Sequence, residues 1–299
     1  MKHFIHLSDF SKQEITHIFE LADKIKADDG LSTPLNGKTI VLFFPESSIR
    51  TRVSFEKGIH ILGGNTILFP PSALDKKEDI RDVIGYLENF ADMVIVRHKD
   101  LAVIEYMAEN SHIPIINAMT SVNHPCEILT DLYSLSKKYI DYCEKEYLFT
   151  IINIFDYCEK EYLFIGAKGN IGNTWKVASE LMEFKFTQCC PKGYEIDGAS
   201  VCYDLEQAIA NKDIICTDSI PSVAKDDFKG YQITLEHMKY ANVDACLNPC
   251  PPFFRGEEVS ADAIDSEYFV GYEFKKSLLE VQQAIICYLF SCIEDKTNR

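Results

Sequence analysis

Long apolar runs and an excess of positive charge are both missing from this sequence. No apolar run approaches the roughly 20 residues that cross a bilayer, and residues 1–9 lack the long apolar core of a signal peptide. The 30 Lys and Arg are outnumbered by 46 Asp and Glu, which gives a formal net charge of -16. Coating nucleic acid requires a basic surface. We therefore expect no nucleic-acid partner, no membrane partner and a cytoplasmic protein.

CxxC pairs are also absent, although the chain has 11 cysteines. A zinc ribbon is therefore unsupported, and we expect no metal. The size of the chain and its N-terminal sequence are not typical of a secreted disulfide framework. We expect the thiols to be reduced and most of them to be packing residues.

Apolar segments alternate with amphipathic ones along the chain. A capping box at Ser11–Glu14 and the apolar spacing after it predict a helix over about 11–27. The run Thr39–Phe44 is typical of a parallel strand buried on both faces. Similar patterns predict strands at 66–69, 93–97, 113–118, 162–167, 185–190, 200–203 and 213–218, and helices at 53–62, 78–90, 101–108, 124–138, 173–182 and 277–292.

This order predicts an α/β fold with two doubly wound parallel-sheet domains, 1–140 and 141–299, and a cleft between them. The nonapeptide DYCEKEYLF occurs twice near the boundary, at 141–149 and 156–164. Two such close copies are a local duplication rather than a solenoid repeat. Only the second copy leads into the G-A-K-G-N run, so we assign the strand to it and expect a helix extension or surface insertion at the first.

Polar groups gather where predicted strands end. Two arginines and three hydroxyls occur within Ser47–Arg52, between the first strand and the next helix. A helix N-terminus offers unpaired N–H groups to an anion, and arginine adds bidentate hydrogen bonds. Arg97 closes a later strand and His124 opens a helix; because strand ends share one crevice, Arg50, Arg97 and His124 are expected to converge on one anion.

These motifs resemble those of the aspartate/ornithine carbamoyltransferases. S-I-R-T-R at 48–52 resembles the family's S-T-R-T-R carbamoyl-phosphate signature, and V-R-H at 96–98 and H-P-C-E at 124–127 resemble its second and third motifs. The match extends over nearly the whole chain. It implies a cytosolic homotrimer with each active site at a subunit interface, no cofactor and no metal. It also implies a carbamoyl-phosphate-binding domain (1–140) and an amino-acid-binding domain (141–299) whose last helix, about 277–293, packs back on the first.

The resemblance also implies roles for residues of the first domain. Ser48, Ile49, Arg50 and Thr51 would hold the phosphate. Arg97 and His124 would donate to the carbamoyl oxygen, and Glu127, where ornithine enzymes have Gln, would accept from the carbamoyl NH2. The segment 72–78 matches a loop that reaches into a neighbouring subunit's active site; its candidate residues are Ser72, Lys76 and Lys77.

In the second domain the resemblance points to an ornithine site. Asn170 matches an Asn that holds the substrate's α-carboxylate, and D-S-I-P-S-V-A at 218–224 resembles the D-x-x-x-S-M-G ornithine loop. N-P-C-P-P at 248–252, followed by R-G-E-E-V at 255–259, resembles the H-C-L-P catalytic loop. The residues implied here are Asp218, Ser222, Val223 and Cys250. Pro249 stands where the family has His, and Leu278 lies near the position of an expected Arg.

The expected reaction transfers the carbamoyl group of carbamoyl phosphate to the δ-amine of ornithine, giving citrulline and phosphate. An aspartate site would need arginines for two carboxylates, and residues 212–250 contain none. Other amines remain open as substrates: an acylated ornithine, putrescine or aspartate. A catalytically weak member of the family, acting as a binding or regulatory subunit, is also open because of Glu127, Pro249 and the missing Arg.

Overall fold

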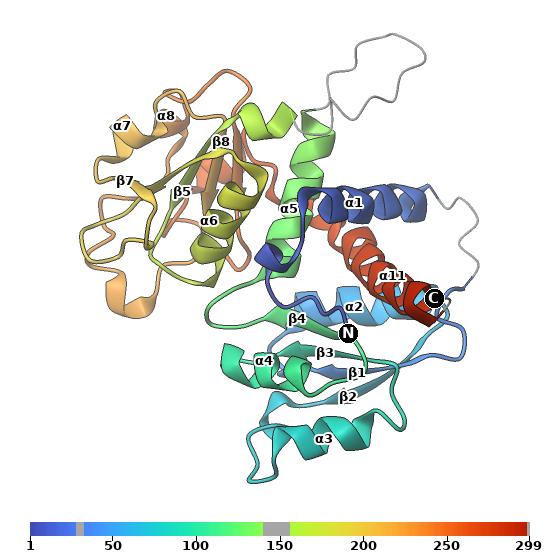
Figure 1. Ribbon diagram of the computed structural model, residues 1–299. Coiled ribbons are helices and arrows are strands. Elements are labelled where there is room, and N and C mark those ends of the chain that lie inside the picture. Colours follow the sequence, from blue (N-terminus) through green and yellow to red (C-terminus); the bar gives the residue numbers. More distant parts are fainter. Residues whose placement is uncertain (28–32, 140–155, 298–299) are drawn as a thin grey trace, which may run out of the picture. The chain divides into compact units, whose positions relative to one another are not determined.

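The computed structural model describes residues 1–27, 33–139 and 156–297, which form two compact units (Figure 1). The first unit contains Met1–Tyr133 and Ser277–Arg299, and the second contains Ser134–Lys276. The first copy of the repeated nonapeptide lies outside the described residues. The second copy runs into strand β5 (Glu161–Ile165), as predicted.

The first unit is built on a four-stranded parallel sheet in the order β2-β1-β3-β4. Its elements are η1 (Leu7–Asp9), α1 (Lys12–Lys26), β1 (Thr39–Phe43), α2 (Ile49–Ile61), β2 (Asn65–Phe69), η2 (Pro71–Ala73), α3 (Ile80–Leu87), β3 (Met93–Arg97), α4 (Leu101–Glu109), β4 (Ile115–Met119), the start of α5 (Pro125–Lys138) and α11 (Leu278–Thr297).

Helices cover both faces of this sheet. Val41, Val94 and Ile115 point to one face, where they pack with Ile84 of α3 and Ile104 of α4. Side chains alternate along a strand, so the intervening residues face the other way, where α2 lies (Figure 1). The strands are apolar throughout because both of their faces are buried.

The last helix packs back on the first unit, as the resemblance implies, and it lies against α1 and α2. Ser11 caps α1: Glu14 N donates to its Oγ at 3.3 Å, and Ser11 N donates to Glu14 Oε2 at 2.8 Å. The other carboxylate oxygen of Glu14 accepts from Tyr288 of α11 at 2.7 Å. Gln283 donates to the carbonyl of Gly58 in α2 at 3.0 Å, where a Cβ atom would stand 3.0 Å from the Gln283 side chain.

The second unit has a five-stranded parallel sheet in the order β7-β6-β5-β8-β9. Its remaining elements are α6 (Asn170–Met182), β6 (Lys185–Cys189), β7 (Ser200–Cys202), α7 (Leu205–Ile209), β8 (Ile214–Thr217), η4 (Ser222–Ala224), α8 (Leu235–Met238), β9 (Cys246–Pro249), α9 (Ala261–Ile264) and α10 (Gly271–Lys276).

Two layers of side chains cover this second sheet. Leu163, Ile215 and Leu247 pack on one face with residues of α7, α8 and α9. On the other face Tyr162 lies 5.8 Å, centroid to centroid, from Trp175 of α6. Gly172 allows α6 to come this close, because a Cβ there would be 2.6 Å from the ring of Phe164. The helix is thereby held directly over β5.

Several predicted boundaries were wrong. Helix α2 begins at Ile49 rather than near 53, and α6 begins at Asn170 rather than 173, so polar residues that we placed in loops form the first helical turns. Strand β9 and the short helices α7 to α10 were missed. Strand β9 reads C-L-N-P, and four residues that end in Asn and Pro carry no strand periodicity.

Within the described residues, no helix has both the length and the apolarity that crossing a membrane requires.

Candidate active site

The phosphate-site residues lie where the order of the first sheet reverses. The chain goes from β1 outward to β2, then back to the other side of β1 to form β3. In such sheets ligands bind at the carboxyl ends of the strands that flank this switch point. Here β1 leads into the start of α2, and β3 ends at Arg97. The S-I-R-T-R run and Arg97 therefore occupy the expected position for a ligand.

Arg97 is bonded directly to the N-terminal turn of α2. Its Nη1 donates to Ser48 Oγ at 2.9 Å and to Thr51 Oγ1 at 3.3 Å. Both hydroxyl residues are buried, at 2% and 7% exposure. Ser48 occupies the N-cap position of α2, but its side chain does not cap the helix. The hydroxyl that would normally cover the first N–H groups of the helix is thus turned to the guanidinium, and those groups stay available to an anion.

The other residues of this turn point outward. Arg50 is exposed, and among the described residues its guanidinium is in no ion pair. Arg52, two positions on, is bonded to Glu56 at 2.9 Å within the helix. Ile49 is 70% exposed. Of the two arginines in the motif, Arg50 is therefore the one that can serve a ligand.

A hollow of about 310 Å³ adjoins Arg97. His98, Lys99 and Asp75 also line it. Asp75 belongs to the segment 72–78, in which Ser72, Lys76 and Lys77 are all exposed. The candidate neighbouring-subunit residues thus lie on the surface close to the end of β3.

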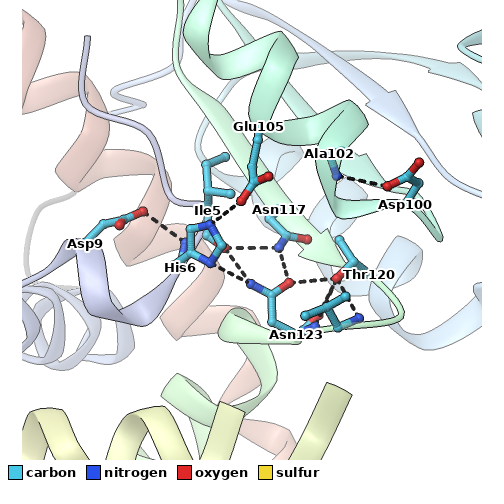
Figure 2. A network of polar contacts seen from close by, with 10 residues as sticks. Ile5, His6, Asp9, Asp100, Ala102, Glu105, Asn117, Thr120 and Asn123 are labelled. Atoms are coloured by element: carbon cyan, nitrogen blue, oxygen red, sulfur yellow. Dashed lines mark hydrogen bonds and ion pairs between the residues drawn. The ribbon is translucent and has the colours of Figure 1, made fainter. Parts of the chain in front are cut away.

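A polar network holds the turn that precedes His124 (Figure 2). Asn117 Nδ2 donates to Asn123 Oδ1 at 2.7 Å, and Thr120 Oγ1 donates to the same oxygen at 2.8 Å. The amide nitrogens of Asn117 and Asn123 both donate to the carbonyl of Ile5, at 3.0 and 3.1 Å. His6 Nδ1 accepts from Asn123 at 3.2 Å. Our sequence analysis missed this network, because Ile5 and His6 lie more than 100 positions from Asn117 and Asn123 and no local pattern links them.

His124 and Glu127 follow this network and are both 7% exposed. They lie between the end of β4 and the first turn of α5. Because β4 pairs with β3, this strand end is next to the one that carries Arg97. Between them Cys126 is fully buried, and its thiol donates to the carbonyl of Asn117 at 3.4 Å. Burial, together with the adjacent Glu127 charge, raises the pKa of the Cys126 thiol. This cysteine is therefore a packing residue and not a nucleophile.

The second sheet has its own switch point, between β5 and β8. Asn170 starts the helix after β5, and its Oδ1 accepts from Ile171 N at 2.9 Å. Asp218 follows β8, and its Oδ1 accepts from Ser219 N at 2.8 Å. Two of the residues predicted to bind the amine therefore flank the position where this type of sheet binds ligands.

Cys250 is brought next to Asp218 by strand pairing. Thr217 of β8 pairs with Pro249 of β9, and Cys250 N donates to Thr217 O at 2.8 Å. In the nearby turn η4, Ala224 is fully buried, whereas Val223 is 90% exposed. Ser222 and Val223 therefore stand on an exposed turn that Ala224 anchors.

Glu258 is a buried carboxyl that our sequence analysis did not single out. It is 2% exposed; its Oε1 accepts from Phe254 N, and its Oε2 has no hydrogen-bond partner among the described residues. Burial raises the pKa of the Glu258 carboxyl, and the charges of Glu257 and Asp218 act in the same direction. The R-G-E-E-V motif was a signal for it, but nothing in the motif distinguishes the buried Glu258 from the partly exposed Glu257.

The described residues contain no group of three or more His, Cys, Asp or Glu side chains placed to hold a metal ion.

Residues 2–137 match the carbamoyl-P binding domain of aspartate/ornithine carbamoyltransferases, and residues 159–289 match the Asp/Orn binding domain of the same enzymes.

The chain belongs to the aspartate/ornithine carbamoyltransferase family.

This carbamoyltransferase is 32% identical over 312 residues to the ornithine carbamoyltransferase of Methylobacillus flagellatus, with 97% of each chain covered. Its fold is similar to the crystal structure of ornithine carbamoyltransferase from Burkholderia thailandensis, with a TM-score of 0.84, 27% identity and coverage of 97% of this chain and 98% of the other. It is also similar in fold to an N-acetyl-L-ornithine transcarbamylase variant complexed with carbamyl phosphate and N-succinyl-L-norvaline, with a TM-score of 0.82, 23% identity and coverage of 97% and 100%.

Proposed function

We propose that this carbamoyltransferase transfers the carbamoyl group of carbamoyl phosphate to the δ-amine of ornithine, producing citrulline and phosphate without a cofactor. The observation that carries the proposal is the contact of Arg97 with Ser48 and Thr51 at the N-terminus of α2. It joins a fixed positive charge to a helix end with available N–H groups, which is the chemistry that a phosphate requires.

The first unit supplies the groups for carbamoyl phosphate. Ser48, Arg50, Thr51 and the Ile49 backbone bind the phosphate. Arg97 and His124 donate to the carbonyl oxygen, on which negative charge grows as the amine attacks. Glu127 accepts from the carbamoyl NH2. The amine nitrogen forms a bond to the carbonyl carbon and loses a proton, and the carbon–oxygen bond to phosphate breaks, with the electron pair leaving on phosphate.

The second unit supplies the groups for the amine. Asn170 binds the α-carboxylate, and Asp218 binds the α-ammonium group, with Ser222 and Val223 on the turn beside it. Cys250 borders the δ-amine. The Asp218 carboxylate favours a substrate with two amines over aspartate, whose extra carboxylate would be repelled. An acylated ornithine lacks the α-ammonium charge and would leave Asp218 uncompensated.

We further propose that the enzyme is a homotrimer in which Ser72, Lys76 and Lys77 complete a neighbouring subunit's phosphate site. Their exposure and the absence of ion pairs for the two lysines among the described residues support this. Sedimentation equilibrium should give a mass near three chains of 34.1 kDa. A monomer that retains full activity would rule out a shared site.

Product formation from a panel of amines tests the reaction. Carbamoyl phosphate is supplied with ornithine, N-acetylornithine, putrescine or aspartate, and the carbamoylated product is measured by mass spectrometry. We expect citrulline as the main product. Carbamoylaspartate or N-acetylcitrulline as the main product would contradict the ornithine assignment. Tight binding of carbamoyl phosphate with no turnover of any amine would favour a binding or regulatory subunit instead.

A further inference from the structure

Leu74 and Asp75, which follow η2, contact the end of β3 through one apolar and one polar contact. His98 Nε2 lies 3.1 Å from Asp75 Oδ1. The imidazole is 3% exposed, whereas the Asp75 side chain is 49% exposed. Leu74, the preceding residue, is buried in the same apolar cluster as Val96 of β3. Residues 74 and 75 are therefore fixed relative to the strand that ends at Arg97.

The polar contact forms in both charge states of His98. A carboxylate oxygen only accepts, so Nε2 carries the proton that it donates to Asp75. Nδ1 lies 3.1 Å from both the amide nitrogen and the carbonyl oxygen of Asp100. A neutral ring accepts from the amide, and a protonated ring donates to the carbonyl. Each ring nitrogen thus has a partner in either state.

Two lysines, Lys76 and Lys77, directly follow Asp75 in the chain. Lys76 and Lys77 are exposed, and in the described part of the chain neither ammonium group is in an ion pair. Consecutive Cα atoms are about 3.8 Å apart, so both side chains start within two residue steps of Asp75. Fixing where a long side chain starts limits the volume that its ammonium group samples and raises its local concentration at a fixed target.

We propose that His98 is a positioning residue whose contact with Asp75 aims Lys76 and Lys77 at the phosphate bound by a second copy of the chain. This inference rests on the proposed function, in which the 72–78 segment completes a neighbouring site. His98 also lines the same hollow as Arg97. The rival assignment is therefore that His98 serves its own subunit's site, and the two assignments differ in which subunit a substitution affects.

Two substitutions of His98 separate its ring nitrogens. In His98→Asn the shorter amide takes the place of Nδ1, keeps the contact with Asp100 and does not reach Asp75. In His98→Gln the amide nitrogen takes the place of Nε2 and keeps the donor to Asp75. We expect His98→Asn to raise the KM for carbamoyl phosphate about tenfold with a smaller change in kcat, and His98→Gln to stay within about threefold of the unsubstituted enzyme. Equal kinetics of the two variants would overturn the proposal.

Asp75→Ala provides the second measurement at a half-exposed position, where folding is least disturbed. It should raise KM by a factor similar to that of His98→Asn, and the double variant should be no worse than either single one, because both remove the same contact. Additive effects would contradict a shared role. Melting temperatures of all variants are recorded. A rise in KM that follows the fall in melting temperature, and not the difference between His98→Asn and His98→Gln, would indicate a structural role alone.

Mixed oligomers decide which subunit is affected. The Asp75→Ala or His98→Asn chain is co-expressed with an Arg50→Ala chain that carries a different tag, and the hybrids are purified. We expect activity above the sum of the two parents, because the Arg50→Ala subunit supplies an intact 72–78 segment to a site that still has Arg50. Hybrids without this gain would show that His98 acts on the active site of its own subunit.

The failure of the proposed function and the failure of this inference give different results. Absence of citrulline with the unsubstituted chain would contradict the proposed function. Citrulline formation with unchanged kinetics in every variant would contradict the positioning role alone.

Discussion

Arg97 Nη1 donates to Ser48 Oγ at 2.9 Å, which joins the end of β3 to the residue before α2. The two residues are 49 positions apart, and parallel strand pairing brings them together. The guanidinium is therefore held in place before any substrate arrives. A charge that needs no rearrangement during the reaction stabilises developing negative charge more effectively than a mobile one.

Replacing the hydroxyl should loosen this arginine. We expect Ser48→Ala to lower kcat/KM for carbamoyl phosphate at least about tenfold, since a hydrogen bond to a charged group contributes roughly 1.5–3 kcal/mol. Steady-state kinetics check this, with Ser47→Ala as the control because Ser47 is the exposed neighbouring serine. Equal kinetics in the two variants would show that Thr51 alone orients Arg97.

Arg50 and Arg52 form a matched pair on one helical turn. Arg50 is exposed without an ion pair, whereas Arg52 is bonded to Glu56. Arg50→Ala should abolish detectable binding of carbamoyl phosphate in titration calorimetry, because a bidentate phosphate contact is lost. Arg52→Ala should change the affinity little, since a surface ion pair contributes only about 0–1 kcal/mol to stability. Unchanged affinity in Arg50→Ala would remove the phosphate-site assignment of the motif.

Asp218 should determine the choice of amine. Asp218→Asn is expected to lower kcat/KM for ornithine at least about tenfold, because a charge-assisted hydrogen bond to the α-ammonium group contributes roughly 1.5–3 kcal/mol. The same variant should leave the affinity for carbamoyl phosphate unchanged. Asp226→Asn is the control, since Asp226 is 90% exposed and paired with Lys229. A similar loss in both variants would point to a general electrostatic effect.

Glu14 makes the packing of α1 on α11 sensitive to acid. Burial of the carboxyl acts to raise its pKa, but hydrogen bonds from Ser11, Tyr288 and Lys2 outweigh burial and lower the pKa to about 2 from an ordinary value of 4.5. A lowered pKa in the folded state means that the stabilisation is present above pH 4.5 and is lost as the pH falls towards 2.

The variant Glu14→Gln should therefore be less stable than the unsubstituted protein at pH 7, by on the order of 1 kcal/mol after allowing for solvent screening. The difference should shrink as the pH falls from about 5 to 3. Urea unfolding at several pH values measures it, and Glu20→Gln, at an exposed position of the same helix, is the control. A difference that stays constant with pH would show that the carboxylate charge does not stabilise this packing.

Much of the fold and the site follows from local sequence. Continuous apolar runs such as Thr39–Phe43 predict buried parallel strands, and polar residues directly after them predict the ligand edge of the sheet. This strand-end argument singles out Arg50, Arg97 and His124. The roles of Ser48, Thr51, Asp218 and Cys250 come from the resemblance of their motifs to the family, and they stay predictions. Their positions depend on strand order, which the alternation of strands and helices largely determines.

Contacts between distant, individually ordinary residues could not be predicted. Nothing near Ile5 indicates that its carbonyl binds two asparagines more than 100 positions later, and nothing in the 72–78 segment indicates that Asp75 meets His98. Burial of Glu258 depends on how the turn at Phe254 folds back on it, which is a tertiary effect. Such side chains lack a periodic pattern, so the sequence alone cannot say which of them become buried.

The packing of α11 on α1 also affects the order in which the chain can fold during synthesis. Domains generally form as their residues leave the ribosome, from the N-terminus onward. The first unit, however, cannot complete its core until Val281, Ala284 and Ile285, all fully buried, have been synthesised. Every strand of the second unit precedes these residues in the chain. The nascent protein can therefore finish the second unit while the first, although begun earlier, still exposes the surface of α1 that awaits its last helix.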